Sequence, residues 1–141
     1  MTDVLTPSVV VDSVAKWRTF LESGATKVPE GLFAPDVFSD LTFPHWRTQT
    51  AGAEALVAGR RASHPQPGTV RVEKVVGDES GYTMKIEERW ADGGQEWYCR
   101  EAFVCDLDEA GAITEFSLYC TGDWDEARQA EHARAETLLR P

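Results

Sequence analysis

The sequence has few basic residues for its length and no long apolar run. Against 24 aspartates and glutamates stand only 14 lysines and arginines, which gives a formal net charge of -10. This negative charge argues against a nucleic-acid backbone or an anionic membrane surface as a partner. No apolar stretch approaches the ~20 residues that a membrane-spanning helix needs. The N-terminus also lacks the basic and apolar segments of a signal peptide.

Cysteines and the usual catalytic signatures are scarce as well. The three cysteines, Cys99, Cys105 and Cys120, have no disulfide-framework spacing, which predicts reduced thiols in a cytoplasmic protein. The three histidines lack metal-ligand spacing. The chain contains no Gly-rich phosphate loop and no nucleophile elbow. We therefore expect neither a metal nor a cofactor.

A succession of helix and strand patterns predicts one domain over residues 1–141. A first helix is expected between Ser8, as its N-cap, and Gly24. Its apolar positions recur at helical spacing: Val10, Val14, Trp17 and Leu21. The expected elements that follow are a helical turn at 29–33, a strand at 37–43, a helix at 53–61 and a loop at 64–68.

The second half of the chain predicts four long strands and a last helix. The strands are expected at residues 69–76, 81–90, 96–107 and 112–121. Short Gly- and Asp-containing connections between them indicate antiparallel hairpins, hence a meander. Asp123 can cap a helix that runs to about residue 139. Helices first and an antiparallel sheet afterwards is an α+β pattern.

Two of these strands carry a glutamate on an otherwise apolar face, because side chains alternate along a strand. Glu101 shares its face with Trp97, Cys99, Phe103 and Cys105. Glu88 shares its face with Tyr82, Met84, Ile86 and Trp90. A buried, unpaired carboxylate is very costly, so each glutamate must be paired, protonated, at an edge or functional.

Three short segments have the order and spacing found in one known family. They are Leu32-Phe33-Ala34-Pro35-Asp36-Val37, Gly52-Ala53-Glu54-Ala55-Leu56 and Gly111-Ala112-Ile113. With the order of elements from residue 10 to about residue 124, the chain resembles the nuclear transport factor 2-like superfamily, also called SnoaL-like or ketosteroid isomerase-like. The resemblance implies a cone-shaped, curved antiparallel sheet closed by the N-terminal helices. Members include isomerases, dehydratases, epoxide hydrolases, cyclases and non-catalytic binding modules, so the fold leaves the function open.

The resemblance also suggests roles for single residues. Glu101 falls at the position of the protonated aspartate of the oxyanion hole in ketosteroid isomerases. Their base lies near Leu41, one residue after Asp40, and a one-residue difference reverses the face on which a side chain lies. Leu118 stands where limonene-epoxide hydrolases carry a catalytic aspartate, which argues against their mechanism.

A hairpin turning at Gly94-Gln95 would place Glu88 directly opposite Glu101, with Cβ atoms roughly 4.5–5.5 Å apart. Such a pair can hold one proton between an acid and a base. The competing interpretations are an ion pair of Glu88 with an arginine, for which the candidates are Arg47, Arg60 and Arg61, and a strand face that is solvated or forms an interface.

Histidines supply a second set of candidates. His45, between Pro44 and Trp46, is either a base near a cavity mouth or an ordinary loop histidine. His64 and His132 are expected to be exposed to solvent.

These patterns predict a cofactor-independent acid/base enzyme of isomerase, dehydratase or cyclase type that acts on a small apolar molecule. Glu101 would be the protonated donor, Glu88 its partner, and Asp40 or His45 the base. The expected cavity walls are Trp17, Trp46, Met84, Trp90, Trp97, Phe103, Phe116 and Leu118. The alternative is a non-catalytic small-molecule-binding or dimerisation module. In either case we expect a homodimer formed through the exposed face of the last two strands.

Overall fold

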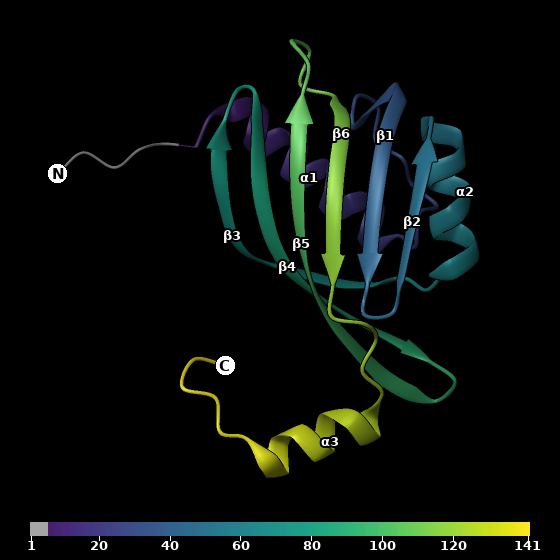
Figure 1. Cartoon of the computed structure of the whole chain (residues 1–141), viewed down its shortest axis with the longest axis vertical. Helices are drawn as coiled ribbons and strands as arrows, with labels where there is room; N and C mark the ends of the chain where they lie inside the picture. The colour runs from purple at the N-terminus through teal and green to yellow at the C-terminus, as the bar shows by residue number, and fades with distance from the viewer. Residues whose placement is uncertain (1–5) are drawn as a thin grey trace, which may run out of the picture.

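One curved six-stranded sheet organises residues 6–141, which this computed structural model describes (Figure 1). Residues 1–5, on which the expected absence of a signal peptide partly rests, lie outside the described residues. The helices are α1 (Ser8–Glu22), α2 (Ala53–Ser63) and α3 (Glu126–Ala135). The strands are β1 (Phe33–Phe43), β2 (Trp46–Ala51), β3 (Gly68–Asp78), β4 (Gly81–Asp92), β5 (Gln95–Leu107) and β6 (Ile113–Cys120).

The strands lie in the order β2-β1-β6-β5-β4-β3. The predicted meander from β3 to β6 is present, and each neighbouring pair in it is antiparallel. β1 pairs with β6 in parallel, so the prediction of a wholly antiparallel sheet is wrong at this pair. Hairpin signals concern strands that are neighbours in sequence, whereas β1 and β6 are far apart along the chain. The α+β class is confirmed.

Strand β2 is the element that the sequence analysis did not predict. Pro44 and His45 form the turn between β1 and β2, in which Phe43 pairs with Trp46. β2 forms the edge of the sheet, and its side chains are almost all exposed. A strand without a buried face has no apolar alternation to mark it.

The ends of several elements also differ from the predictions. Pro7, not Ser8, occupies the N-cap of α1 and makes no side-chain cap bond. The chain makes a turn rather than a helical segment before β1, where the Leu32 N–H donates to the Pro29 carbonyl oxygen at 3.1 Å. α3 is capped by Asp125, whose side chain accepts from the Arg128 N–H at 2.8 Å. Over residues 6–141, no helix is long and apolar enough to cross a lipid bilayer.

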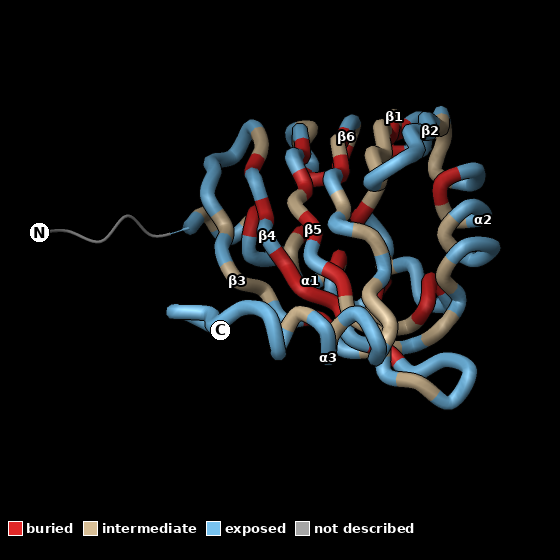
Figure 2. Tube along the Cα trace, turned by 60° about the horizontal axis from the view of Figure 1, so that its bottom comes forward, coloured by how far each residue is buried: buried red, intermediate tan, exposed pale blue. Residues whose placement is uncertain are grey.

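The core lies between the sheet and α1 and is built around Trp17. Its indole ring meets Phe103 and Phe116 on the sheet, with ring centroids 4.8 and 5.0 Å away. Phe33 and Phe20 complete this aromatic cluster at 5.2 and 6.2 Å. α2 packs against β1 and β2, at the other end of the sheet. Figure 2 shows buried segments along β4 and β5, whereas α3 contains no buried residue.

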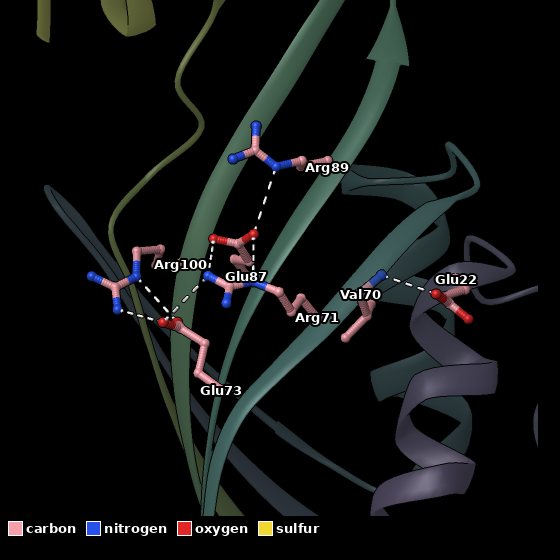
Figure 3. A network of polar contacts seen from close by, with 7 residues as sticks. All are labelled: Glu22, Val70, Arg71, Glu73, Glu87, Arg89 and Arg100. Carbon is pink, nitrogen blue, oxygen red and sulfur yellow. Dashed lines mark hydrogen bonds and ion pairs between the residues drawn. The ribbon is translucent and has the colours of Figure 1, made fainter. Parts of the chain in front are cut away.

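The face of the sheet turned away from this core is polar and carries a network of charges (Figure 3). Arg71 donates to Glu87 at 2.9 and 3.1 Å, and Arg89 lies 3.7 Å from the same carboxylate. Arg100 donates to Glu73 at 2.8 and 3.2 Å. Because Glu87 lies on this outer face, the alternation of side chains along β4 points the next residue, Glu88, toward the core.

Candidate functional site

A cavity of about 560 Å³ lies between the inner face of the sheet and the helices α1 and α2. Trp17, Phe20, Phe103 and Phe116 form its aromatic wall. Its polar end is formed by seven side chains: Arg60, His64, Glu88, Cys99, Glu101, Cys120 and Asp123. A largely apolar cavity with a few polar groups at one end is typical of a small-molecule site.

Glu88 is paired with Arg60, one of the three candidate arginines. The guanidinium group donates to both carboxylate oxygens, at 2.8 and 3.4 Å. Both side chains are largely buried, with 16% of Arg60 and 5% of Glu88 exposed. Burial alone would raise the pKa of Glu88, but the hydrogen bond from Glu101 and the charge of Arg60 outweigh it and lower this pKa. Glu88 is therefore the ionised member of the carboxyl pair.

Glu101 is buried beside Glu88, and no cation among the described residues makes an ion pair with it. Burial, followed by the negative charge of Glu88 and the hydrogen bond to it, raises the pKa of Glu101 well above the ordinary value. The Cys99 thiol also donates to a Glu101 oxygen at 3.6 Å. One proton is thus held on Glu101 and donated to Glu88, which is the asymmetric arrangement needed for an acid and a base.

The two glutamates do not lie directly opposite each other. Glu88 pairs with Cys99 and Ile86 with Glu101, so the predicted register is wrong by two residues. The hairpin turns at Gly93 and Gly94, whose φ angles of 59° and 76° suit a two-residue turn that requires positive φ at both positions. Glu88 and Glu101 are diagonal neighbours on one face, and their long side chains still meet.

His64 is a cavity residue that the sequence analysis missed. It was expected to be solvent-exposed, but it lines the cavity, with its ring edge-on to Trp90 at a centroid distance of 4.3 Å. Burial, and then the charge of Arg60, lowers the pKa of His64 to about 4. The sequence contained a signal for this placement. Arg60 and His64 are four residues apart, and that spacing brings two side chains together on one side of a helix.

Two overlapping groups of side chains have the composition of a metal site. The donor atoms of Cys99, Cys120 and Asp123 lie within 4.8 Å of one another, as do those of Glu88, Cys99 and Glu101. A cysteine ligates zinc as the thiolate. The hydrogen bond with Cys120 and burial raise the pKa of the Cys99 thiol, which therefore keeps its proton. Both groups contain this thiol, which a metal ion would have to deprotonate on binding.

The two predicted bases lie away from the cavity. Asp40 accepts two hydrogen bonds from Arg47, at 2.8 and 2.6 Å, and the hydrogen bond from Arg47 lowers the pKa of Asp40. Its neighbour Leu41 lines the cavity instead, which settles the register of β1. His45 is exposed in the turn between β1 and β2. The described residue that has a carboxylate at the cavity rim is Asp123.

Five of the eight predicted wall residues line the cavity: Trp17, Trp46, Phe103, Phe116 and Leu118. The other three lie elsewhere. Met84 is buried in the core, and Trp90 packs beneath His64. Trp97 stacks on Trp90 near the hairpin end, where its Nε1–H donates to the Asp92 carbonyl oxygen at 3.1 Å. Thr48 and Thr50 of the unpredicted strand β2 are additional lining residues.

Comparison with known proteins identifies the fold. No family model matches the chain, and no curated protein matches it. A nuclear transport factor 2-like protein of unknown function from Burkholderia xenovorans is 11% identical, covers 94% of this chain and 96% of its own, and has a TM-score of 0.63. An LEH-like epoxide hydrolase of Mycobacterium tuberculosis is 12% identical, with coverages of 80% and 83% and a TM-score of 0.63. A Jannaschia protein assigned as a SnoaL-like polyketide cyclase is 15% identical, with coverages of 98% and 99% and a TM-score of 0.60. The prediction of a nuclear transport factor 2-like fold is confirmed.

Proposed function

We propose that the protein is a cofactor-independent acid/base enzyme, of isomerase, dehydratase or cyclase type, that acts on a small, largely apolar molecule in the cavity. The observation that carries the proposal is the buried carboxyl pair, in which Arg60 pairs with Glu88 and burial beside Glu88 raises the pKa of Glu101. The likeness in fold to a SnoaL-like cyclase and to an epoxide hydrolase-like protein supports an enzyme.

In this proposal Glu101 donates its proton, as a hydrogen bond or completely, to a substrate oxygen. Negative charge that develops on that oxygen is then stabilised in a site that excludes most water, where such a hydrogen bond is strong. Glu88 remains ionised because Arg60 neutralises it. Because Arg60 makes its ion pair with Glu88, the one available proton stays on Glu101.

For a carbonyl substrate, a base must remove a proton from the carbon α to the carbonyl group that carries that oxygen. Asp123 takes the role that the sequence analysis gave to Asp40 or His45, because its carboxylate lies at the rim of the same cavity. Partial burial and the charge of Glu88 raise the pKa of Asp123. A raised pKa makes a carboxylate a stronger base near neutral pH.

The test is a carboxyl carbon NMR titration of the protein, with Glu87→Gln as the control. Glu87 precedes Glu88 in β4 but pairs with Arg71 on the outer face. We expect the Glu101 carbon to titrate well above the ordinary value of 4.5 and the Glu88 carbon below it. In Glu88→Gln, the Glu101 titration should move downward, because the neighbouring negative charge is gone; in Glu87→Gln it should not move.

A second measurement follows the exchange of the α-protons of 1-indanone into D2O, a proton transfer beside a carbonyl that needs no knowledge of the natural substrate. Glu101→Gln should slow the enzyme-dependent exchange at least ~100-fold, the usual scale for losing a general acid or an oxyanion donor. If Glu101 instead titrates at its ordinary value, the acid/base proposal is abandoned for the non-catalytic binding module.

A further inference from the structure

Polar atoms without a partner gather at one corner of the cavity. Among the described residues, four buried side-chain nitrogens have no hydrogen-bond partner: Trp17 Nε1, Arg60 Nε and both ring nitrogens of His64. Arg60 and His64 line the cavity together. Buried polar groups in folded proteins are nearly always hydrogen-bonded, so three orphaned nitrogens in one corner call for an explanation.

The backbone and ring of His64 are held firmly. Its backbone N–H donates to the Arg60 carbonyl oxygen at 2.8 Å, which fixes the end of α2. Its ring lies edge-on to Trp90. The charged groups that act on the ring are Arg60 from α2 and Glu88 and Asp92 from β4. The imidazole is neutral at pH 7 and therefore has one N–H donor and one nitrogen acceptor.

In the orientation of the ring seen here, both nitrogens are buried and have no partner. A half-turn about the Cβ–Cγ bond exchanges each ring nitrogen with a ring carbon while the backbone stays in place. His64 is one of the residues that line the cavity, so such a turn would offer a nitrogen to a ligand bound there. The chemistry of the bound group is then set by what a neutral imidazole can pair with.

We infer that His64 binds a hydroxyl group of the substrate, so that the substrate is a neutral alcohol or hydroxy-carbonyl compound with an apolar body. A hydroxyl both donates and accepts, and so pairs with either imidazole nitrogen, whereas a carbonyl pairs with the donor alone. Arg60 and Glu88 neutralise each other in an ion pair, so this corner attracts neither a cation nor an anion strongly. The inference rests on the proposed function, since it takes the cavity to be the substrate site.

The experiment compares two achiral probes of similar shape, 2-indanol and 2-methylindane. Their dissociation constants are measured by NMR titration with the wild-type chain, with His64→Phe, and with His132→Phe as the matched control. His132 lies on α3 against Trp124 and is not part of the cavity lining. We expect the preference for 2-indanol over 2-methylindane to fall about threefold to tenfold in His64→Phe, the scale of one neutral hydrogen bond. The preference should not change in His132→Phe.

A second variant guards against a change in packing. His64→Asn keeps a donor and an acceptor and should retain most of the preference for 2-indanol. If both probes bind the wild type and the preference survives in His64→Phe, the role of His64 is refuted while the cavity remains a ligand site. If neither probe binds the wild type, the proposed function fails, and the inference fails with it.

Discussion

The ion pair of Arg60 with Glu88 allows the electrostatics of the cavity to be tested quantitatively. Arg60→Met keeps a long apolar side chain but leaves Glu88 without its counter-ion. The loss of stability has a ceiling, because a carboxylate that cannot be stabilised takes up a proton instead. Holding Glu88 protonated at pH 8 costs about 5 kcal/mol, at ~1.36 kcal/mol for each pH unit above its ordinary pKa of 4.5. At pH 5.5 the same ceiling is about 1.4 kcal/mol.

We therefore expect Arg60→Met to lower the free energy of unfolding by roughly 3–5 kcal/mol at pH 8, and by much less at pH 5.5. The penalty grows with pH because the unfolded chain releases the proton that the folded variant retains. Urea unfolding at the two pH values measures both numbers. The double variant Arg60→Met/Glu88→Gln should recover most of the loss, since no buried charge remains.

The matched control is Arg71→Met on the outer face. Arg71 also forms a two-bonded pair with a glutamate, but its side chain is 56% exposed. Its removal should cost less than about 1 kcal/mol. A loss in Arg60→Met that is equally small, or that is the same at pH 8 and pH 5.5, would refute the picture of Glu88 as a desolvated carboxylate held by Arg60.

Four further outcomes are expected. The folded pKa of His64, about 4, lies below its ordinary 6.5, so the contribution of His64 to the free energy of unfolding is complete above pH 6.5 and is lost as pH falls toward 4. Urea unfolding at several pH values should show that His64→Phe reduces this loss of stability at low pH. An unchanged pH dependence in His64→Phe would contradict the prediction. Phe103→Ala should lower the free energy of unfolding by roughly 3–5 kcal/mol, and Trp97→Ala by less, because Phe103 is 1% exposed and Trp97 lies half-buried near a hairpin end; urea midpoints rank the two. Cys120, half-buried on the cavity wall, should react with N-ethylmaleimide before the two buried cysteines, as peptide mass mapping would show, and simultaneous labelling would count against this. Finally, sedimentation should detect a homodimer formed through the outer face of β5 and β6, and a monomer at micromolar concentration and above would disprove it.

Local patterns in the sequence were enough to predict most of the fold. The helical spacing that leads to Trp17 identified α1, and the alternation along β4 and β5 placed Glu88 and Glu101 on the inner face. The sequence did not predict β2, because an exposed edge strand has no buried face and therefore no apolar alternation. The parallel pairing of β1 with β6 depends on long-range packing, which turn residues between neighbouring strands do not encode.

The candidate site was predictable only in part, because its residues meet through tertiary structure. The sequence singled out the two glutamates but left three arginines as partners of Glu88, and only the packing of α2 selects Arg60. His64 was misread because the prolines that follow it suggested an exposed loop, whereas Trp90 covers its ring. The register of the β4–β5 hairpin depended on which glycine begins the turn, a choice that Gly93 and Gly94 leave open in the sequence.

Among the described residues, the buried cation at the cavity, Arg60, belongs to a helix, while Glu88 and Glu101 belong to the sheet. Leu56 is the one buried side chain of α2, so apolar contacts alone hold this short helix weakly. Moving α2 away from the sheet also separates Arg60 from Glu88 in a medium of low dielectric constant, where opposite charges attract strongly. The ion pair of Arg60 with Glu88 thus helps to hold α2 against the sheet. Mutations in α2 or in the turns that flank it would move Arg60 and thereby change the pKa of Glu101, without altering any residue of the sheet. The reactivity of the site could thus evolve separately from the sheet that holds its acids.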